Sequence, residues 1–99
     1  MLTIEKTLDN GELDVVLGGR LDTTTSPDLE NALKGDLENI SVLKFDLADL
    51  EYMSSAGLRI LLSAHKTVSK HGSMKLTNVN ETINEILEIT GFLDIFEIE

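Results

Sequence analysis

Four small residues, Ser54-Ser55-Ala56-Gly57, stand directly before an apolar run that has the spacing of a helix. A serine at the mouth of a helix can cap a free backbone N–H, which stabilises the helix by about 1 kcal/mol. Capping needs one hydroxyl, whereas here two serines, an alanine and a glycine are consecutive. Three interpretations are therefore open: a plain helix cap, a catalytic nucleophile, or a bare surface for another protein.

A catalytic serine needs a general base within hydrogen-bond reach and N–H donors for an oxyanion. The nucleophile motif G-x-S-x-G is absent, because only Gly57 is present of its two glycines, and it is offset by one. His65 lies ten residues beyond Ser55, roughly 15 Å along a helix, and is out of reach of either serine. We therefore expect His65 and His71 on the solvated side of the helix, and we predict no enzymatic activity.

Metal and cofactor sites are not predicted either. The two histidines are six residues apart, which does not place them on one helical face. Asp46, Asp49 and Glu51 are hard-cation ligands by type, but their spacing is not that of a calcium loop. Gly18-Gly19-Arg20 lacks the lysine and the spacing of a phosphate-binding loop.

The composition predicts a single domain over residues 1–99 with an ordinary core. Of the 99 residues, 41% are hydrophobic, and none is cysteine, which excludes a disulfide framework and fits a reducing compartment. The first residues lack the basic and apolar regions of a signal peptide. No apolar stretch approaches the roughly 18–20 residues of a membrane span. We therefore expect a cytoplasmic protein.

Acidic residues outnumber basic ones by 18 to 8, so the net charge is -10. Nucleic-acid binding depends on lysines and arginines that neutralise phosphates, and binding to an anionic membrane makes the same demand. The charge therefore predicts neither nucleic acid nor a membrane as a partner. It leaves open a surface that keeps a small protein soluble and a surface that meets a basic partner.

The first part of the chain predicts a hairpin and a helix. Apolar residues at every second position, on both sides of a tight-turn signal at 9–11, indicate an antiparallel hairpin over residues 2–17, which two consecutive glycines end. A helix follows, with Ser26 as its cap and Pro27 at its first position. This helix is expected to end between residues 34 and 38.

The rest of the chain alternates between strand and helix patterns. The expected elements are a strand over 42–47, a loop over 48–53, a helix from Gly57 to about His71, a strand over 73–79, a helix capped by Asn80 and closed by Gly91, and a strand over 95–98. The element order is therefore β-β-α-β-α-β-α-β. Such alternation predicts an α/β fold with one mixed sheet, in which right-handed crossover helices join parallel strands.

The helix is expected to face the sheet with an apolar stripe of four residues, Ile60, Leu61, Ala64 and Val68. Leu58 and Leu62 lie off this stripe. The first turns of this helix are apolar nearly all round, which is more than one layer of sheet covers. Two interpretations are open at this point. The two leucines either form a docking surface beside the small residues, or belong to the core under the first helix or the preceding loop.

Residues 46–59, DLADLEYMSSAGLR, resemble the signature of STAS domains, in particular of bacterial anti-sigma-factor antagonists. Gly19-Arg20-Leu21-Asp22 is similar to the family's loop after the second strand. Residues 89–92, followed by Ile95-Phe96, are similar to its third helix and last strand. The resemblance covers essentially the whole chain and implies a STAS-like fold.

The resemblance implies a switch protein without a cofactor. In this family the unphosphorylated protein binds an anti-sigma factor that is also a serine kinase, which frees the sigma factor. Phosphorylation of a serine at the start of the second helix breaks that complex, and a serine phosphatase restores it. By position the acceptor falls on Ser55. The alternative is Ser54, which stands where the family often has aspartate.

The resemblance also implies a partner-binding surface around the acceptor and the loop of Asp22. Its expected residues are Asp22, Thr23, Ser54, Ala56, Gly57, Leu58, Arg59 and Leu62. The alternative function is a STAS-like subunit of a larger assembly, such as a lipid-transport or stress-signalling complex. That subunit would dock a partner through the same surface without turnover of phosphate.

Overall fold

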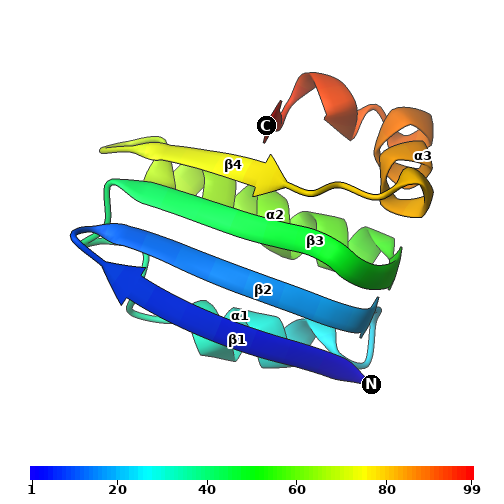
Figure 1. Cartoon of the computed structure of the whole chain (residues 1–99), viewed down its shortest axis with the longest axis horizontal. Helices are drawn as coiled ribbons and strands as arrows, with labels where there is room; N and C mark the ends of the chain where they lie inside the picture. The colour runs from blue at the N-terminus through cyan, green and yellow to red at the C-terminus, as the bar shows by residue number, and fades with distance from the viewer.

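A computed structural model describes every residue of the chain, 1–99, as a five-stranded mixed sheet with three α-helices. The strands lie side by side in the order of the sequence: β1 (Leu2–Asp9), β2 (Glu12–Leu21), β3 (Val42–Met53), β4 (Ser73–Thr77) and β5 (Glu97–Ile98). β1 and β2 form an antiparallel hairpin, and the later neighbours pair in parallel (Figure 1). The predicted α/β class and element order are confirmed.

Two helices cover one face of this sheet. In Figure 1, α1 (Ser26–Leu33) and α2 (Ser55–Val68) both lie behind the strands. The third helix, α3 (Glu81–Thr90), lies to one side and packs against β3. A short 3-10 helix, η1 (Phe92–Asp94), then leads the chain back to β5. None of these helices is both long and apolar enough to cross a bilayer.

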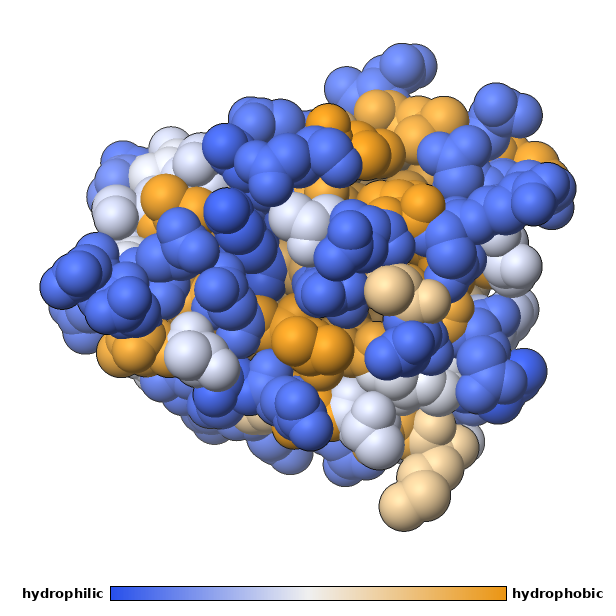
Figure 2. Space-filling model, in the orientation of Figure 1, coloured by the Kyte–Doolittle hydropathy of each residue, from blue (hydrophilic) through white to orange (hydrophobic).

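The alternation of side chains along the strands decides which face of the sheet is buried. In β3 the fully buried side chains of the first half are Leu43, Phe45 and Leu47. Lys44 and Asp46, between them, point to the opposite face and stay partly exposed. Figure 2 shows the molecule from this opposite side, where hydrophilic side chains lie among apolar ones. The helices cover the apolar face with residues at helical spacing, chiefly Leu29, Leu33, Leu61, Ala64 and Val68. The core is one continuous cluster between the sheet and these helices.

Two strands run further than the sequence predicted. β2 continues through Gly18 and Gly19, and β3 continues through the expected loop over 48–53. The register between β2 and β3 shifts beside these glycines. The two strands therefore stay paired although the spacing of their apolar residues becomes irregular. Gly19 has a φ of +86°, and a Cβ there would clash with the carbonyl of Met1. The glycines therefore bend the strand where they were expected to end it.

Both covering helices begin earlier than predicted, α1 by one residue and α2 by two. Thr25, not Ser26, is the N-cap of α1. Ser26 is buried in the first turn, where its hydroxyl donates to the carbonyl of Asp22 at 2.6 Å. α2 begins at Ser55, two residues before the expected start, and it ends before His71, at Val68.

The C-terminal elements follow the prediction except at their ends. Gly91 closes α3 in the left-handed conformation, with a φ of +82°. β4 ends at Thr77, two residues before the expected end. The last strand begins at Glu97 and not at Ile95, because the N–H groups of Ile95 and Phe96 donate to the carbonyl of Phe92 in the turn that closes η1.

Asn80 joins α3 to the second half of β3. Its Oδ1 accepts a hydrogen bond from the N–H of Ile83 at 2.9 Å, which is the predicted helix cap. Its Nδ2 lies within hydrogen-bond distance of three carbonyls, those of Leu47 (3.0 Å), Ala48 (3.2 Å) and Leu50 (2.8 Å). One side chain therefore satisfies the backbone of the strand that leads into α2 and begins the next helix.

The prediction that Leu58 faces a partner is wrong. Its side chain is 3% exposed and belongs to the core, because β2 and β3 extend beneath the first turn of α2 as far as Leu21 and Met53. Gly57 is buried too, since a Cβ at this position would lie 2.6 Å from Cγ of Leu21. Gly57 thus lets the helix approach the sheet. Leu62 is half-buried and packs against the core cluster.

We expect Leu58→Ala to lower the free energy of unfolding by about 2–4 kcal/mol, because it removes buried apolar atoms and leaves a cavity. Leu8→Ala is the matched control: Leu8 is 66% exposed, and its truncation should change stability by less than about 0.5 kcal/mol. Urea denaturation of both variants measures the difference. A loss below about 1 kcal/mol for Leu58→Ala would contradict its place in the core.

Candidate functional site

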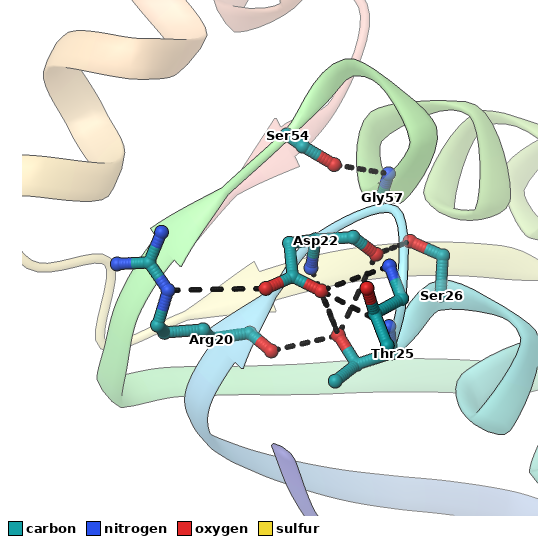
Figure 3. A network of polar contacts seen from close by, with 7 residues as sticks. Arg20, Asp22, Thr25, Ser26, Ser54 and Gly57 are labelled. Atoms are coloured by element: carbon teal, nitrogen blue, oxygen red, sulfur yellow. Dashed lines mark hydrogen bonds and ion pairs between the residues drawn. The ribbon is translucent and has the colours of Figure 1, made fainter. Parts of the chain in front are cut away.

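The candidate site lies where β2 and β3 end and α2 begins. The last pairs of the parallel ladder join Arg20 to Tyr52 and Leu21 to Met53. The N–H of Ser54 then donates to the carbonyl of Leu21 at 2.8 Å. The carboxyl ends of parallel strands share one edge of a sheet, so the loop after β2 and the first turn of α2 lie side by side (Figure 3). The two segments of the predicted site are therefore neighbours in space.

The two adjacent serines have different environments. Ser54 is the N-cap of α2: it is half-buried, and its Oγ accepts a long hydrogen bond of 3.4 Å from the N–H of Gly57. Ser55 is the first residue of the helix and is exposed, and its hydroxyl makes no hydrogen bond within the protein. The capping role and a free hydroxyl are thus divided between the two residues.

The loop after β2 is held by hydrogen bonds that converge on Asp22. Its Oδ1 accepts from the N–H groups of Thr24 and Thr25, each at 3.0 Å. Oγ1 of Thr25 accepts from the N–H of Asp22 at 2.9 Å, and its one proton is shared between the carbonyl of Arg20 at 2.8 Å and Oδ1 of Asp22 at 3.2 Å (Figure 3). Thr23, at the tip of this loop, is exposed. The loop is therefore rigid at its base and presents its tip to solvent.

The pKa of the Asp22 carboxyl is held below its usual value of 3.8, chiefly by the hydrogen bond from the Thr25 N–H. Desolvation by the loop opposes this effect and raises the pKa. The Thr25 hydroxyl, the Thr24 N–H and the Arg20 guanidinium each lower it further. Asp22 is therefore ionised at neutral and mildly acidic pH, the state in which it accepts these bonds.

Arg20 and Tyr52 form a contact that the sequence analysis missed. Cζ of Arg20 lies 4.5 Å from the centroid of the Tyr52 ring, and its Nε lies 3.8 Å from Oδ2 of Asp22. At an exposed surface a cation–π contact and a long ion pair are each weak, but together they orient the guanidinium. The pairing of Arg20 with Tyr52 in the β2–β3 ladder is the signal for this contact. The predicted strands ended before both residues, so this pair could not be foreseen.

The predicted partner-binding residues divide by exposure. Thr23 and Arg59 are exposed, Asp22, Ser54, Ala56 and Leu62 are half-buried, and Gly57 and Leu58 are buried. The accessible part at this edge, together with the exposed Ser55, is named here the α2 N-terminal surface. It consists of Asp22, Thr23, Ser54, Ser55, Ala56 and Arg59.

The expectation that both histidines lie on the solvated side of the helix is wrong for His65, which is half-buried, whereas His71 is exposed but lies beyond the end of α2. The ring of His65 meets the buried ring of Phe96 edge-on, with 5.9 Å between centroids, and its Nδ1 is buried without a hydrogen-bond partner. Nε2 of His71 lies 2.8 Å from the carbonyl of Leu37. The amphipathic spacing did not reveal this, because both contacts come from segments remote in the sequence.

A comparison with models of protein families shows to which family this chain belongs. The model of the STAS domain matches residues 3–99. The chain belongs to the STAS domain family. An anti-sigma-B factor antagonist from Bacillus subtilis (strain 168) is 31% identical over 98 residues, which are 98% of this chain and 90% of that protein.

Solved structures share the architecture of this STAS domain. An anti-sigma factor antagonist from Mycobacterium paratuberculosis has a TM-score of 0.89 at 23% identity, covering 99% of this chain and 85% of that one. The Bacillus cell fate determinant SpoIIAA, in its phosphorylated form, has a TM-score of 0.74 at 15% identity, covering 100% and 91%. At these identities the likeness shows the fold of the STAS domain.

The lowered pKa of Asp22 predicts a loss of stability in acid. A carboxylate with a depressed folded-state pKa stabilises the protein above its unfolded-state pKa of about 3.9, and this contribution disappears as the pH falls through the folded-state pKa. We expect the carboxyl carbon of Asp22 to titrate with a midpoint below 3.8 in ¹³C NMR spectra. Asp22→Asn should make the free energy of unfolding less dependent on pH below about 4.

Thr25→Val is the informative companion variant, because it removes the hydroxyl but keeps the backbone N–H of residue 25. It should raise the midpoint of Asp22 part of the way back toward 3.8. A midpoint at or above 3.8 in the wild-type protein would contradict the hydrogen-bond network described here.

Proposed function

We propose that this STAS domain is a phosphorylation-controlled antagonist of an anti-sigma factor, acting in the cytoplasm as a binding protein and not as an enzyme. Unphosphorylated, it binds an anti-sigma factor that is also a serine kinase, and the sigma factor is released. Phosphorylation of Ser55 breaks the complex, and a serine phosphatase restores the binding form. The Bacillus subtilis relative is named for antagonism of an anti-sigma factor, and SpoIIAA has a phosphorylated form.

The observation that carries this proposal is the contrast between the two serines. A kinase needs a hydroxyl that it can reach and that no other group engages. Ser55 is exposed and unbonded at the first position of α2, whereas Oγ of Ser54 is occupied by the N–H of Gly57. This contrast favours Ser55 over Ser54 as the acceptor.

The position of Ser55 also accounts for a switch that leaves the fold intact. A phosphate at the first turn of a helix is tolerated, because free N–H groups and the positive end of the helix dipole lie there. It adds about -1.5 to -2 charges at an exposed residue whose hydroxyl makes no hydrogen bond within the chain. A partner packed closely over Ser54, Ser55 and Ala56 would have to desolvate this charge, so the complex would break.

We expect Ser55→Ala to fold normally and to lose all phosphate transfer from the cognate anti-sigma factor kinase. Ser54→Ala should keep its phosphorylation, although the loss of the cap lowers the free energy of unfolding by about 1 kcal/mol. Radiolabelled ATP and mass spectrometry of the intact chain measure incorporation in both variants. Undiminished incorporation in Ser55→Ala, with loss in Ser54→Ala, would move the acceptor by one residue.

Ser55→Glu should weaken binding to the purified anti-sigma factor by about 2 kcal/mol or more, roughly thirtyfold, because a charge is desolvated in the contact. Ser63→Glu is the matched control, since Ser63 is exposed on the same helix two turns further on. It adds the same charge and should change the affinity by less than twofold. Calorimetric affinities of Ser55→Glu within twofold of wild type would contradict the interface.

The same two experiments separate the alternative function. A STAS-like subunit of a larger assembly without phosphate turnover would bind its partner through the α2 N-terminal surface. It would therefore respond to Ser55→Glu but would incorporate no phosphate at either serine. Binding that responds together with absent phosphorylation would support that alternative.

A further inference from the structure

Arg59 is the arginine near Ser55 that the structure leaves without a partner. The chain has two arginines, and both belong to the edge formed by β2, β3 and α2. Arg20 is engaged by the ring of Tyr52 and the carboxylate of Asp22. Arg59 is exposed, and its guanidinium forms no ion pair, hydrogen bond or cation–π contact. Of the two arginines, Arg59 is therefore the one that is free to meet a new charge at this edge.

Helical geometry places Arg59 next to Ser55. The two residues are four apart on α2, and both are exposed, so their side chains lie on the same face one turn apart. Nothing on the helix competes for the guanidinium, because α2 contains no aspartate or glutamate. The guanidinium of Arg59 could therefore reach the charged oxygens of a phosphate on Ser55. Arginine is well suited to bind phosphate, because its planar N–H groups match the phosphate oxygens.

We propose that Arg59 is the positioning residue for the phosphate on Ser55, which its guanidinium binds across one turn of α2. This inference rests on the proposed function and names the residue that binds the phosphate once Ser55 carries it. In the unphosphorylated protein the guanidinium is free to meet a carboxylate of the partner. In the phosphorylated protein it is engaged within the chain. Phosphorylation thus adds negative charge and also withdraws a cation from the α2 N-terminal surface.

The test uses the full chain with phosphoserine placed at position 55 during translation by a suppressor tRNA, so that no kinase is needed. The second ionisation of the phosphate, near pH 6, is followed by ³¹P NMR. Arg59 stabilises the dianion, so Arg59→Gln should raise the midpoint by about 0.3 pH units, which is the size expected for an ion pair at this spacing. A rise of at least 0.15 pH units supports the proposal, and a smaller one overturns it.

Lys66→Gln is the matched control, because it removes the same charge from an exposed position near the far end of α2. Its midpoint should stay within 0.05 pH units of wild type, and a rise equal to that of Arg59→Gln would overturn the proposal by showing a general effect of net charge. Because phosphoserine is installed directly, this result does not depend on whether a kinase modifies Ser55. The kinase assay on Ser55→Ala decides that question separately.

Discussion

The parallel ladder between β2 and β3 is the constraint on which the site depends. Its last pair, Leu21 with Met53, continues directly into the hydrogen bond between the Ser54 N–H and the Leu21 carbonyl. This bond fixes where α2 starts relative to the loop after β2. The side chain of Leu21 is buried under Gly57, where no Cβ fits, so the first turn of the helix rests on the end of the strand. The small residues of the motif thus serve two needs, close packing at Gly57 and access at Ser55.

In the proposed function, a rigid frame around one free hydroxyl would let a local change act on the partner alone. The loop of Asp22 is closed by its own hydrogen bonds, and Arg20 is held by Tyr52 and Asp22. None of these contacts involves the hydroxyl of Ser55. A modification there would therefore change the charge of the surface without breaking any of these contacts.

The alternation of apolar residues was sufficient to predict the order and type of every strand and α-helix, because a half-buried strand and an amphipathic helix leave different periods. The strand ends were not predictable in this way. They depend on register shifts beside Gly18 and Gly19, which only the pairing with β3 reveals. The error at Leu58 followed from this, since the shorter predicted strands left the first turn of α2 uncovered.

The site was predictable in outline and not in its division of roles. The motif and the resemblance indicated the α2 N-terminal surface, including Asp22 and both serines. Which serine caps the helix depends on where α2 begins, and the sequence placed that start two residues late. The contact of Arg20 with Tyr52 depends on cross-strand register at the end of the ladder, which no local pattern encodes.

The joint at Asn80 has a chemical consequence of its own. Its amide presents an oxygen to the N–H of Ile83 and a nitrogen to the carbonyls of Leu47, Ala48 and Leu50. A change of the amide to a carboxylate, as in Asn80→Asp, would keep the shape of this side chain and its helix cap, but it would replace the donor with an acceptor that faces three other acceptors. An exchange of NH₂ for oxygen would thus turn attraction into repulsion at the seam between α3 and the strand that carries Ser54. The seam therefore depends on an amide, and not on a carboxylate, at residue 80.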